Sequence, residues 1–279
     1  MKQRIITALI LAPLVIAGIF FLPIQAFFMI LAAVTMVGFW EWTQFVSTQS
    51  RVIALTPSIL AFGASMIWLP YDAINLAHTT ESHQWMLIVG VVWWVIASLL
   101  AMSYPTSARL WKESKGLRHL FGWLSLIPFF WSIVLLRAQI GIDDQYYGAK
   151  LVLLVCLLVW SADSGAYFAG KTFGKRKMAP SVSPNKTIEG LIGGVITAML
   201  IGWGATIVFG LHFDSVGAMV GIFMATVIIS VLGDLVESMF KRSSNIKDSG
   251  TIIPGHGGIL DRIDSLVAAF PVFALLYFW

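Results

Sequence analysis

Acidic and basic side chains are concentrated in residues 234–264, between two long apolar runs near the end of the chain. The first part of this stretch carries polar residues three and four positions apart, namely Asp234, Glu237, Ser238 and Lys241. A helix would place all four on one face, and the spacing of Asp261 and Asp264 does the same at the far end. Carboxylates suit a hard cation such as Mg²⁺, while cations and basic side chains neutralise phosphate oxygens. The stretch therefore predicts chemistry on a phosphate group.

A glycine-rich turn separates these two acidic groups. It contains Gly255, His256, Gly257 and Gly258, a composition that disfavours a helix and lets backbone N–H groups converge on an anion. For His256, phosphate contact or proton transfer is a fair hypothesis, whereas metal ligation is weaker because no second histidine or cysteine lies nearby. The alternative is a solvated loop with ordinary surface ion pairs. Two carboxylate pairs joined by one glycine turn make this alternative less favoured.

Residues 238–264 resemble the signature of the phosphatidate cytidylyltransferases, also called CDP-diacylglycerol synthases. The shared pattern is Ser-x-Phe-Lys-Arg, four residues, Lys-Asp-x-Gly, and then Pro-x-His-Gly-Gly-Ile-x-Asp-Arg-Ile-Asp. The segments around Asp163 and Lys186 are also similar to this family, so the resemblance covers the C-terminal half of the chain. The resemblance implies an enzyme that transfers CMP from CTP to phosphatidic acid with Mg²⁺ as its cofactor. It also allows a second, monovalent cation.

The resemblance and the residue types together give a set of expected roles. The catalytic residues are expected to be Asp234, Lys241, His256 and Asp261. The expected metal ligands are Asp234, Glu237, Asp261 and Asp264. The expected substrate-binding residues are Ser183, Asn185, Lys186, Ser238, Arg242, Lys247, Gly257, Gly258 and Arg262. Supporting positions, or a second cation site, are assigned to Asp163 and Asp248.

The elements that must position these residues are membrane helices. Of the 279 residues 58% are hydrophobic and only 11% are charged, and the mean hydropathy is +0.84, which indicates an integral membrane protein. Nine apolar runs are long enough to predict spans: residues 5–22, 24–40, 52–69, 85–102, 117–136, 149–170, 188–210, 216–236 and 264–279. The first run has no small-residue cleavage pattern, so we expect it to be retained as a helix.

The distribution of basic residues orients these spans. With the N-terminus in the cytoplasm, the inner segments hold 16 of the 18 lysines and arginines, and the outer segments hold only Arg137 and Lys150. The C-terminus is then outside, and the chemically rich loops 171–187 and 237–263 face the cytoplasm. We expect a bacterial inner-membrane protein with a five-span scaffold in residues 1–140 and a four-span catalytic part in residues 141–279.

The sixth span contains an acidic residue, Asp163. A charge at this depth is costly unless it faces a cavity, a cation or a basic partner, which favours a functional role. The alternative is a helix-packing hydrogen bond with Ser161 or Ser164. Residues 165–172 formally match the P-loop pattern Gly-x-x-x-x-Gly-Lys-Thr, but a membrane span precedes them instead of a strand, so we reject a P-loop.

Two further predictions concern residues near the membrane edge. Ser183, followed by Pro184, is expected to be the N-cap of a helix whose N-terminus carries Asn185 and Lys186 towards a phosphate. Glu41 could pair with a basic residue, but a snorkelling carboxylate at a helix end is the favoured interpretation.

Other partners and functions stay open at this point. Gly190-x-x-x-Gly194 and Gly217-x-x-x-Gly221 permit a homodimer, although packing within one chain explains them equally well. Membrane lipids are expected partners and nucleic acid is not. A related enzyme acting on an isoprenoid ether lipid would need the same residues. A cation-coupled transporter would also carry intramembrane carboxylates, but the chain lacks the internal repeat that such proteins often show.

Overall fold

The computed structural model describes residues 2–46, 50–72, 76, 78–253, 255 and 257–279, with the backbone alone described for residues 2–8. Within these residues the chain forms ten helices and one small β-hairpin. The nine long helices are α1 (Lys2–Phe21), α2 (Ile24–Val46), α3 (Arg51–Trp68), α5 (Glu81–Met102), α7 (Lys115–Arg137), α8 (Tyr147–Phe173), α9 (Ile188–Phe209), α10 (Val216–Ser243) and α11 (Leu260–Phe278). The remaining elements are the short helix α6 (Ala108–Trp111) and the strands β1 (Lys177–Ala179) and β2 (Ser183–Thr187).

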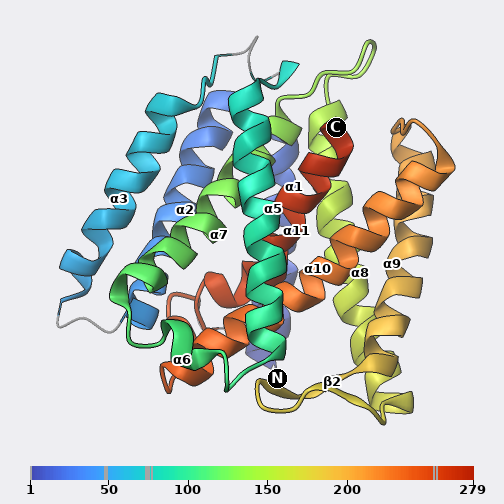
Figure 1. The fold of residues 1–279 in the computed structure, drawn as a ribbon. Helices are drawn as coiled ribbons and strands as arrows, with labels where there is room; N and C mark the ends of the chain where they lie inside the picture. Colours follow the sequence, from blue (N-terminus) through green and yellow to red (C-terminus); the bar gives the residue numbers. More distant parts are fainter. Residues whose placement is uncertain (1, 47–49, 73–75, 77, 254, 256) are drawn as a thin grey trace.

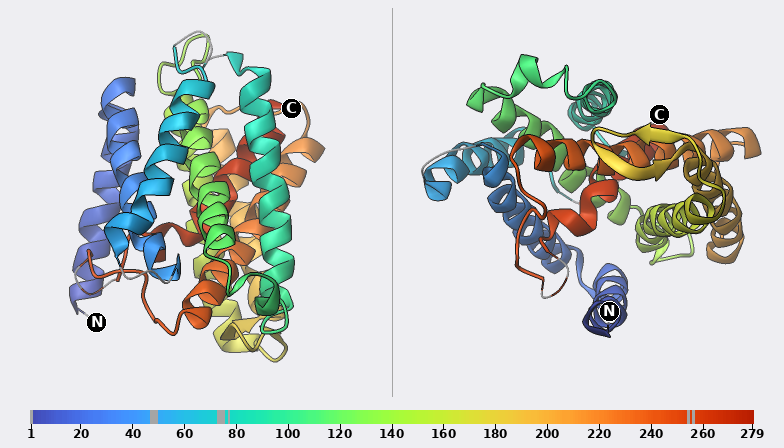
Figure 2. Two further views of the ribbon diagram at one scale, coloured as in Figure 1. Left: turned by 60° about the vertical axis from the view of Figure 1, so that its left-hand side comes forward. Right: turned by 90° about the horizontal axis from the view of Figure 1, so that it is seen from below.

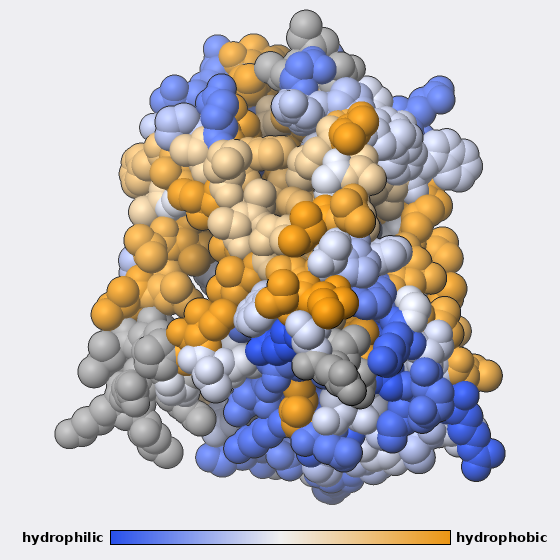
Figure 3. Space-filling model, turned by 90° about the vertical axis from the view of Figure 1, so that its left-hand side faces the viewer, coloured by the Kyte–Doolittle hydropathy of each residue, from blue (hydrophilic) through white to orange (hydrophobic). Residues whose placement is uncertain are grey.

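Each predicted span overlaps one of the nine long helices, which confirms the all-α integral membrane class. Seven of the described helices are long and apolar enough to cross a membrane, namely α2, α3, α5, α7, α8, α9 and α10, and α1 adds a shorter apolar segment at Leu9–Phe21. The ninth helix, α11, begins with Asp261, Arg262 and Asp264, so its first turns are polar. Figure 3 shows the corresponding surface, with an apolar belt between hydrophilic ends.

The helices run up and down through the bundle, and the two ends of the chain lie at opposite ends of it (Figure 1). Helix α11 lies against α10, α7, α5 and α8 at the centre, whereas α3 and α9 stand at opposite flanks. Helices α10 and α11 cross closely at Gly233, where an added Cβ atom would lie only 2.6 Å from Ala268 Cβ. This crossing brings Asp234 of α10 near the first turns of α11.

An aromatic cluster fixes the lower end of α10. The ring of Phe240 lies 5.0 Å from Trp42 and 5.1 Å from Trp111, both measured between ring centroids. Phe45 and Phe121 complete the cluster at 5.7 Å and 6.0 Å from Phe240. Four of these five rings come from α2, α6 and α7, so the N-terminal half of the chain packs directly against the helix that carries Asp234 and Lys241.

The loop predicted at residues 171–187 contains more regular structure than expected. Helix α8 continues to Phe173, so residues 165–172 are helical and do not form a P-loop. The strands β1 and β2 then pair antiparallel, and the hairpin reaches from the α8–α9 pair to the lower end of α10 (Figure 2, right).

The prediction that Ser183 is an N-cap was wrong. Ser183 belongs to β2, and the cap of α9 is Thr187, whose Oγ1 accepts the backbone N–H of Gly190 at 3.1 Å. Pro184 has the extended backbone that a strand edge tolerates, and Glu189 stabilises the turn by accepting the backbone N–H groups of Lys175 and Arg176. Asn185 and Lys186 therefore extend from a strand and not from a helix terminus.

One of the two glycine motifs is used within the chain. The added Cβ atoms of Gly190 and Gly194 would lie 3.0 Å and 2.7 Å from carbonyl oxygens of α8, so these glycines allow α8 and α9 to pack closely. At Gly221 an added Cβ would meet no atom within 4 Å. The homodimer stays a prediction.

Candidate active site

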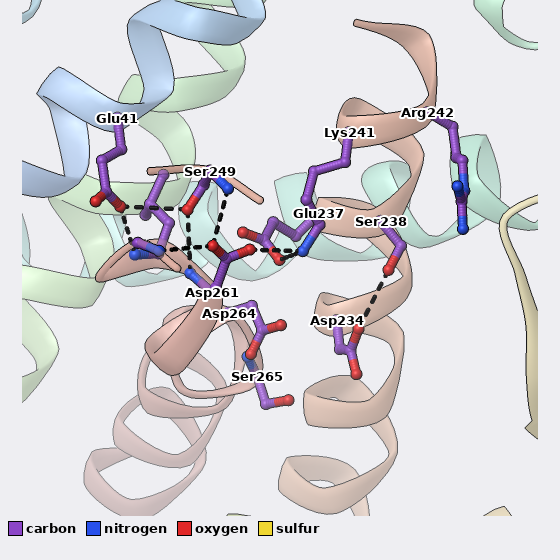
Figure 4. Close-up of polar contacts among 12 residues, drawn as sticks. Glu41, Asp234, Glu237, Ser238, Lys241, Arg242, Ser249, Asp261, Asp264 and Ser265 are labelled. Carbon is purple, nitrogen blue, oxygen red and sulfur yellow. Dashed lines mark hydrogen bonds and ion pairs between the residues drawn. The ribbon is translucent and has the colours of Figure 1, made fainter. Parts of the chain in front are cut away.

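A lysine bridges two buried carboxylates where α10 meets α11 (Figure 4). Lys241 Nζ lies 2.6 Å from Glu237 Oε2 on its own helix and 2.8 Å from Asp261 Oδ1 on α11. Glu237 is 6% exposed and Asp261 9%. The predicted helical face is thus confirmed, because the four-residue spacing of Glu237 and Lys241 gives a direct ion pair. The two carboxylates and one ammonium leave a net charge of −1 at this point.

The second oxygen of Asp261 organises the glycine turn. Asp261 Oδ2 accepts the backbone N–H groups of Ser249 and Gly258, each at 2.8 Å. The N–H of Gly258, which we had expected to face a phosphate, therefore points at this carboxylate. Gly257 has a φ of +84°, a conformation that favours glycine, and an added Cβ there would lie 2.7 Å from Asp261 Oδ2. The turn is built around Asp261.

A residue from the first half of the chain, Glu41, completes this arrangement. Its Oε1 accepts the backbone N–H of Ile259 at 3.0 Å, and its Oε2 accepts that of Leu260 at 2.8 Å. The hydroxyl of Ser249 also donates to Oε2, at 3.3 Å. Glu41 is 1% exposed, so the snorkelling interpretation was wrong. Its carboxylate is held by the unpaired N–H groups at the start of α11, where negative charge is favourable.

The sequence did contain a signal for Glu41. It is an acidic residue in an apolar helix, flanked by Trp40 and Trp42, and such a charge requires a partner. Its hydrogen-bond partners are backbone N–H groups more than two hundred residues further along the chain. The sequence around Glu41 therefore gave no indication of them.

A second ion pair joins the hairpin to α10. Lys186 Nζ of β2 lies 2.6 Å from Asp234 Oδ2 and donates to the carbonyl oxygen of Val231 at 3.1 Å. The hydroxyl of Ser238 donates to the other oxygen of Asp234 at 3.3 Å. Asp163 of α8 interacts electrostatically with both Lys186 and Asp234. The acidic residue of the sixth span therefore faces a basic partner, as one of the sequence interpretations required.

Asp264 connects the two groups, because its carboxylate interacts electrostatically with both Asp234 and Glu237. Beside it lies a small cavity of about 20 Å³ lined by Glu237, Asp264 and Trp94, among others. Glu237 Oε1 is buried and has no hydrogen-bond partner among the described residues. A buried carboxylate oxygen left in this way calls for a cation or another donor.

The net charge of the carboxylates and lysines around Asp264 also favours a bound cation. The whole centre contains five carboxylates and two ammonium groups: Asp163, Asp234, Glu237, Asp261 and Asp264 with Lys186 and Lys241. If all are ionised, the net charge is −3 beside an apolar bundle, and oxygen ligands of this kind suit Mg²⁺. No ready-made group of three metal-ligating side chains occurs within the part of the chain that the structure describes. The carboxylates are nevertheless close enough to interact electrostatically with one another, and their oxygens are of the kind that Mg²⁺ prefers.

The remaining predicted residues lie around this centre with fewer contacts. Arg242 is exposed, and its Nε donates to the carbonyl oxygen of Val182 at 3.3 Å. Asn185, Lys247, Asp248 and Arg262 are also exposed, as is Asp163. Ser183 is partly buried in β2. His256 lies outside the described residues.

These features define a membrane enzyme class: an apolar helical bundle with a charged centre at one end, rich in carboxylates and edged by exposed basic side chains. The model of the cytidylyltransferase family matches residues 2–279. The chain therefore belongs to the cytidylyltransferase family.

Two similar proteins cover nearly the full length of the chain. A phosphatidate cytidylyltransferase from Haemophilus influenzae is 44% identical over 291 residues, covering 100% of this chain and 99% of the relative. One from Pseudomonas aeruginosa is 41% identical over 278 residues, covering 99% of this chain and 96% of the relative. The similarity thus includes the N-terminal helices as well as the signature region.

Proposed function

We propose that this protein is a phosphatidate cytidylyltransferase of phospholipid biosynthesis, which converts CTP and phosphatidic acid into CDP-diacylglycerol and pyrophosphate. The observation that supports this most is the centre of five carboxylates and two lysines at one end of an apolar bundle. Such a centre could serve several reactions of phosphate groups. The full-length relatives that carry this name favour cytidylyl transfer among them.

In the reaction, an oxygen of the phosphatidate phosphate forms a bond to the α-phosphorus of CTP. The bond from that phosphorus to the bridging oxygen of the β-phosphate breaks, and pyrophosphate leaves with the electron pair. No covalent intermediate with the protein is needed, so the side chains position the two phosphates and neutralise their charge.

The two lysines each keep one donor for this purpose. An ammonium group has three hydrogens. Lys241 directs two of them to Glu237 and Asp261, and Lys186 directs two to Asp234 and the Val231 carbonyl, counting the described residues. The third hydrogen of each can reach a phosphate oxygen while the ion pairs stay in place.

Mg²⁺ bound by Glu237 Oε1 and Asp264, with Asp234 nearby, would neutralise the oxygens of the reacting phosphates. Asp261 has one oxygen engaged by Lys241 and the other by the backbone N–H groups of the turn, so in this proposal it holds Lys241 and the glycine turn in place. Arg242, Lys247 and Arg262 are exposed, and in this proposal their side chains bind the outer phosphates. Proton handling by His256 stays a prediction.

The membrane position follows from the same proposal. The excess of basic residues in the predicted inner loops supports a centre on the cytoplasmic side of a bacterial inner membrane, where CTP is available. Phosphatidic acid enters sideways from the bilayer, so its chains stay in lipid while its phosphate reaches the charged end of the bundle.

The experiment uses purified protein in detergent with phosphatidic acid, Mg²⁺ and CTP labelled in the cytosine ring. Label is expected in the lipid fraction with the wild type and with Asp144→Asn, a change at the opposite end of the bundle, but not with Asp261→Asn. Absence of lipid label from folded wild-type protein, also with an ether-lipid phosphate as substrate, would reject the enzyme assignment and favour the cation-coupled transporter.

A further inference from the structure

A second cavity lies far from the charged centre, at the end of the bundle where α2 begins and where α3 and α7 end. It has a volume of about 730 Å³, which is in the range of small-molecule binding pockets. Most of its wall is apolar, with contributions from Phe28, Met29, Met66, Ile67 and Ile140. Met29 and Ile67 are 67% and 90% exposed, so the cavity opens outwards at the apolar belt of the surface. Figure 3 shows this belt.

One cationic side chain, Arg137, lines this cavity. Its Nε donates to the carbonyl oxygen of Ile19 at 2.7 Å, and one of its terminal nitrogens donates to that of Leu22 at 3.3 Å. These bonds hold the guanidinium at the end of α1 and use two of its five N–H donors. No carboxylate forms an ion pair with Arg137 among the residues that the structure describes. The positive charge is therefore fixed in place and not neutralised.

The other polar groups of the wall are neutral. They are the side chains of Gln25, Tyr71, Gln139 and Gln145. Gln139 already donates to the carbonyl oxygens of Leu76 and Leu135. The lining thus offers one charge, which is positive, and hydrogen-bonding groups beside an apolar surface. It offers no negative group that could hold an ammonium.

We propose that this cavity binds an anionic glycerophospholipid, with the phosphate on the free N–H groups of Arg137 and an acyl chain along the apolar wall. A guanidinium and a phosphate form paired, charge-assisted hydrogen bonds. The apolar wall gives the acyl chain contacts like those it has with other lipids in the bilayer. A lipid with a cationic headgroup fits less well because the wall has no carboxylate for the amine. A soluble phosphate would leave the apolar wall unused.

This site is separate from the reaction centre. Arg137 is the last residue of α7, whereas the charged centre lies at the opposite end, near the first turn of that helix (Figure 1). The bound lipid would connect α1, α2, α3 and α7, which are all in the first half of the chain. It would act as a structural ligand of the outer part of the bundle and not as the substrate.

The test measures binding of phosphatidylglycerol and of phosphatidylcholine to delipidated, purified protein by native mass spectrometry. The wild type and Arg109→Gln, which removes an exposed arginine elsewhere, are expected to prefer phosphatidylglycerol. Arg137→Gln is expected to weaken phosphatidylglycerol binding about tenfold, the effect of losing one charge-assisted contact. Met66→Trp, which fills the apolar wall and keeps the charge, is expected to weaken it as well.

The outcomes decide between ligands. Equal binding of the two lipids by the wild type, or phosphatidylglycerol binding that is not weakened in either Arg137→Gln or Met66→Trp, would overturn the proposal. So would stabilisation by glycerol phosphate equal to that by phosphatidylglycerol, because the site would then bind soluble phosphate. If Arg137→Gln does not fold, Met66→Trp alone still tests the site.

Discussion

Glu41 Oε2 accepts the backbone N–H of Leu260 at 2.8 Å, although 219 residues separate them in the sequence. This contact joins the second helix of the chain to the first turn of the last helix, directly beside Asp261. The part expected to be a scaffold, residues 1–140, thus supplies a carboxylate that shapes the glycine turn. Its division from a catalytic part in residues 141–279 stays a prediction.

The Glu41→Gln substitution should weaken this support while keeping the side-chain shape. The amide has one accepting oxygen in place of two, so one N–H group at the start of α11 loses its partner. Loss of a buried bond to a charged group costs about 1.5–3 kcal/mol of unfolding free energy, and we expect activity to fall by about one to two orders of magnitude through misplacement of Asp261. Thermal unfolding and turnover measure the two effects. Glu113→Gln, at an exposed position, should change neither.

The Lys241 bridge should show strong coupling in a double-mutant cycle. Lys241→Met leaves Glu237 and Asp261 buried without their cation, which costs about 3–5 kcal/mol. Adding Glu237→Gln should restore part of the lost stability, because one buried charge is removed. Chemical unfolding in detergent measures the cycle. Fully additive effects would show that the bridge contributes nothing as a unit.

Metal dependence should reside in Glu237 and Asp264. EDTA should abolish lipid labelling, and added Mg²⁺ should restore it. In Glu237→Gln and Asp264→Asn we expect the Mg²⁺ concentration for half-maximal rate to rise about tenfold or more, the effect of losing a ligand or its oriented partner. Asp214→Asn, an exposed residue in the loop between α9 and α10, is the matched control. An unchanged Mg²⁺ requirement in both variants would place the cation elsewhere.

The β1–β2 hairpin should contribute to activity through Lys186. Lys186→Met removes the partner of Asp234 and, in our proposal, a phosphate donor, so kcat/KM should fall about 100-fold or more. Lys177→Met, in the paired strand and exposed, should change it little. Steady-state rates at varied CTP separate the two variants, and equal losses would mean that the hairpin contributes only general positive charge.

The glycine turn should reject a methyl group at Gly258. An added Cβ would lie 2.5 Å from Glu41 Oε2 and would also overlap the Ser249 hydroxyl, so Gly258→Ala should lower both the unfolding temperature and the activity. Gly204→Ala in α9 meets no atom within 4 Å and should be neutral or stabilising, by up to about 1 kcal/mol. Thermal unfolding with a parallel activity assay distinguishes them.

Much of the architecture could be predicted because its signals are local. A span is a run of apolar residues, so the nine helices follow from the amino-acid sequence, and the predicted face of α10 follows from three- and four-residue spacing. The Lys241–Glu237 pair is the direct result. The Ser183 cap was mispredicted because Ser-Pro suits both a helix start and an extended strand, and pairing with Lys177–Ala179 decided between them.

The sequence by itself determined the class of membrane protein, the nine long helices of the described residues and the stretch in which acidic and basic side chains gather. Only the tertiary structure decided which charges meet: Lys241 with Asp261, Lys186 with Asp234, and Glu41 with the start of α11. The reason is physical. Helix geometry fixes neighbours within one or two turns, whereas contacts between distant segments depend on how whole helices pack, and that packing is set by the buried surface of the entire bundle.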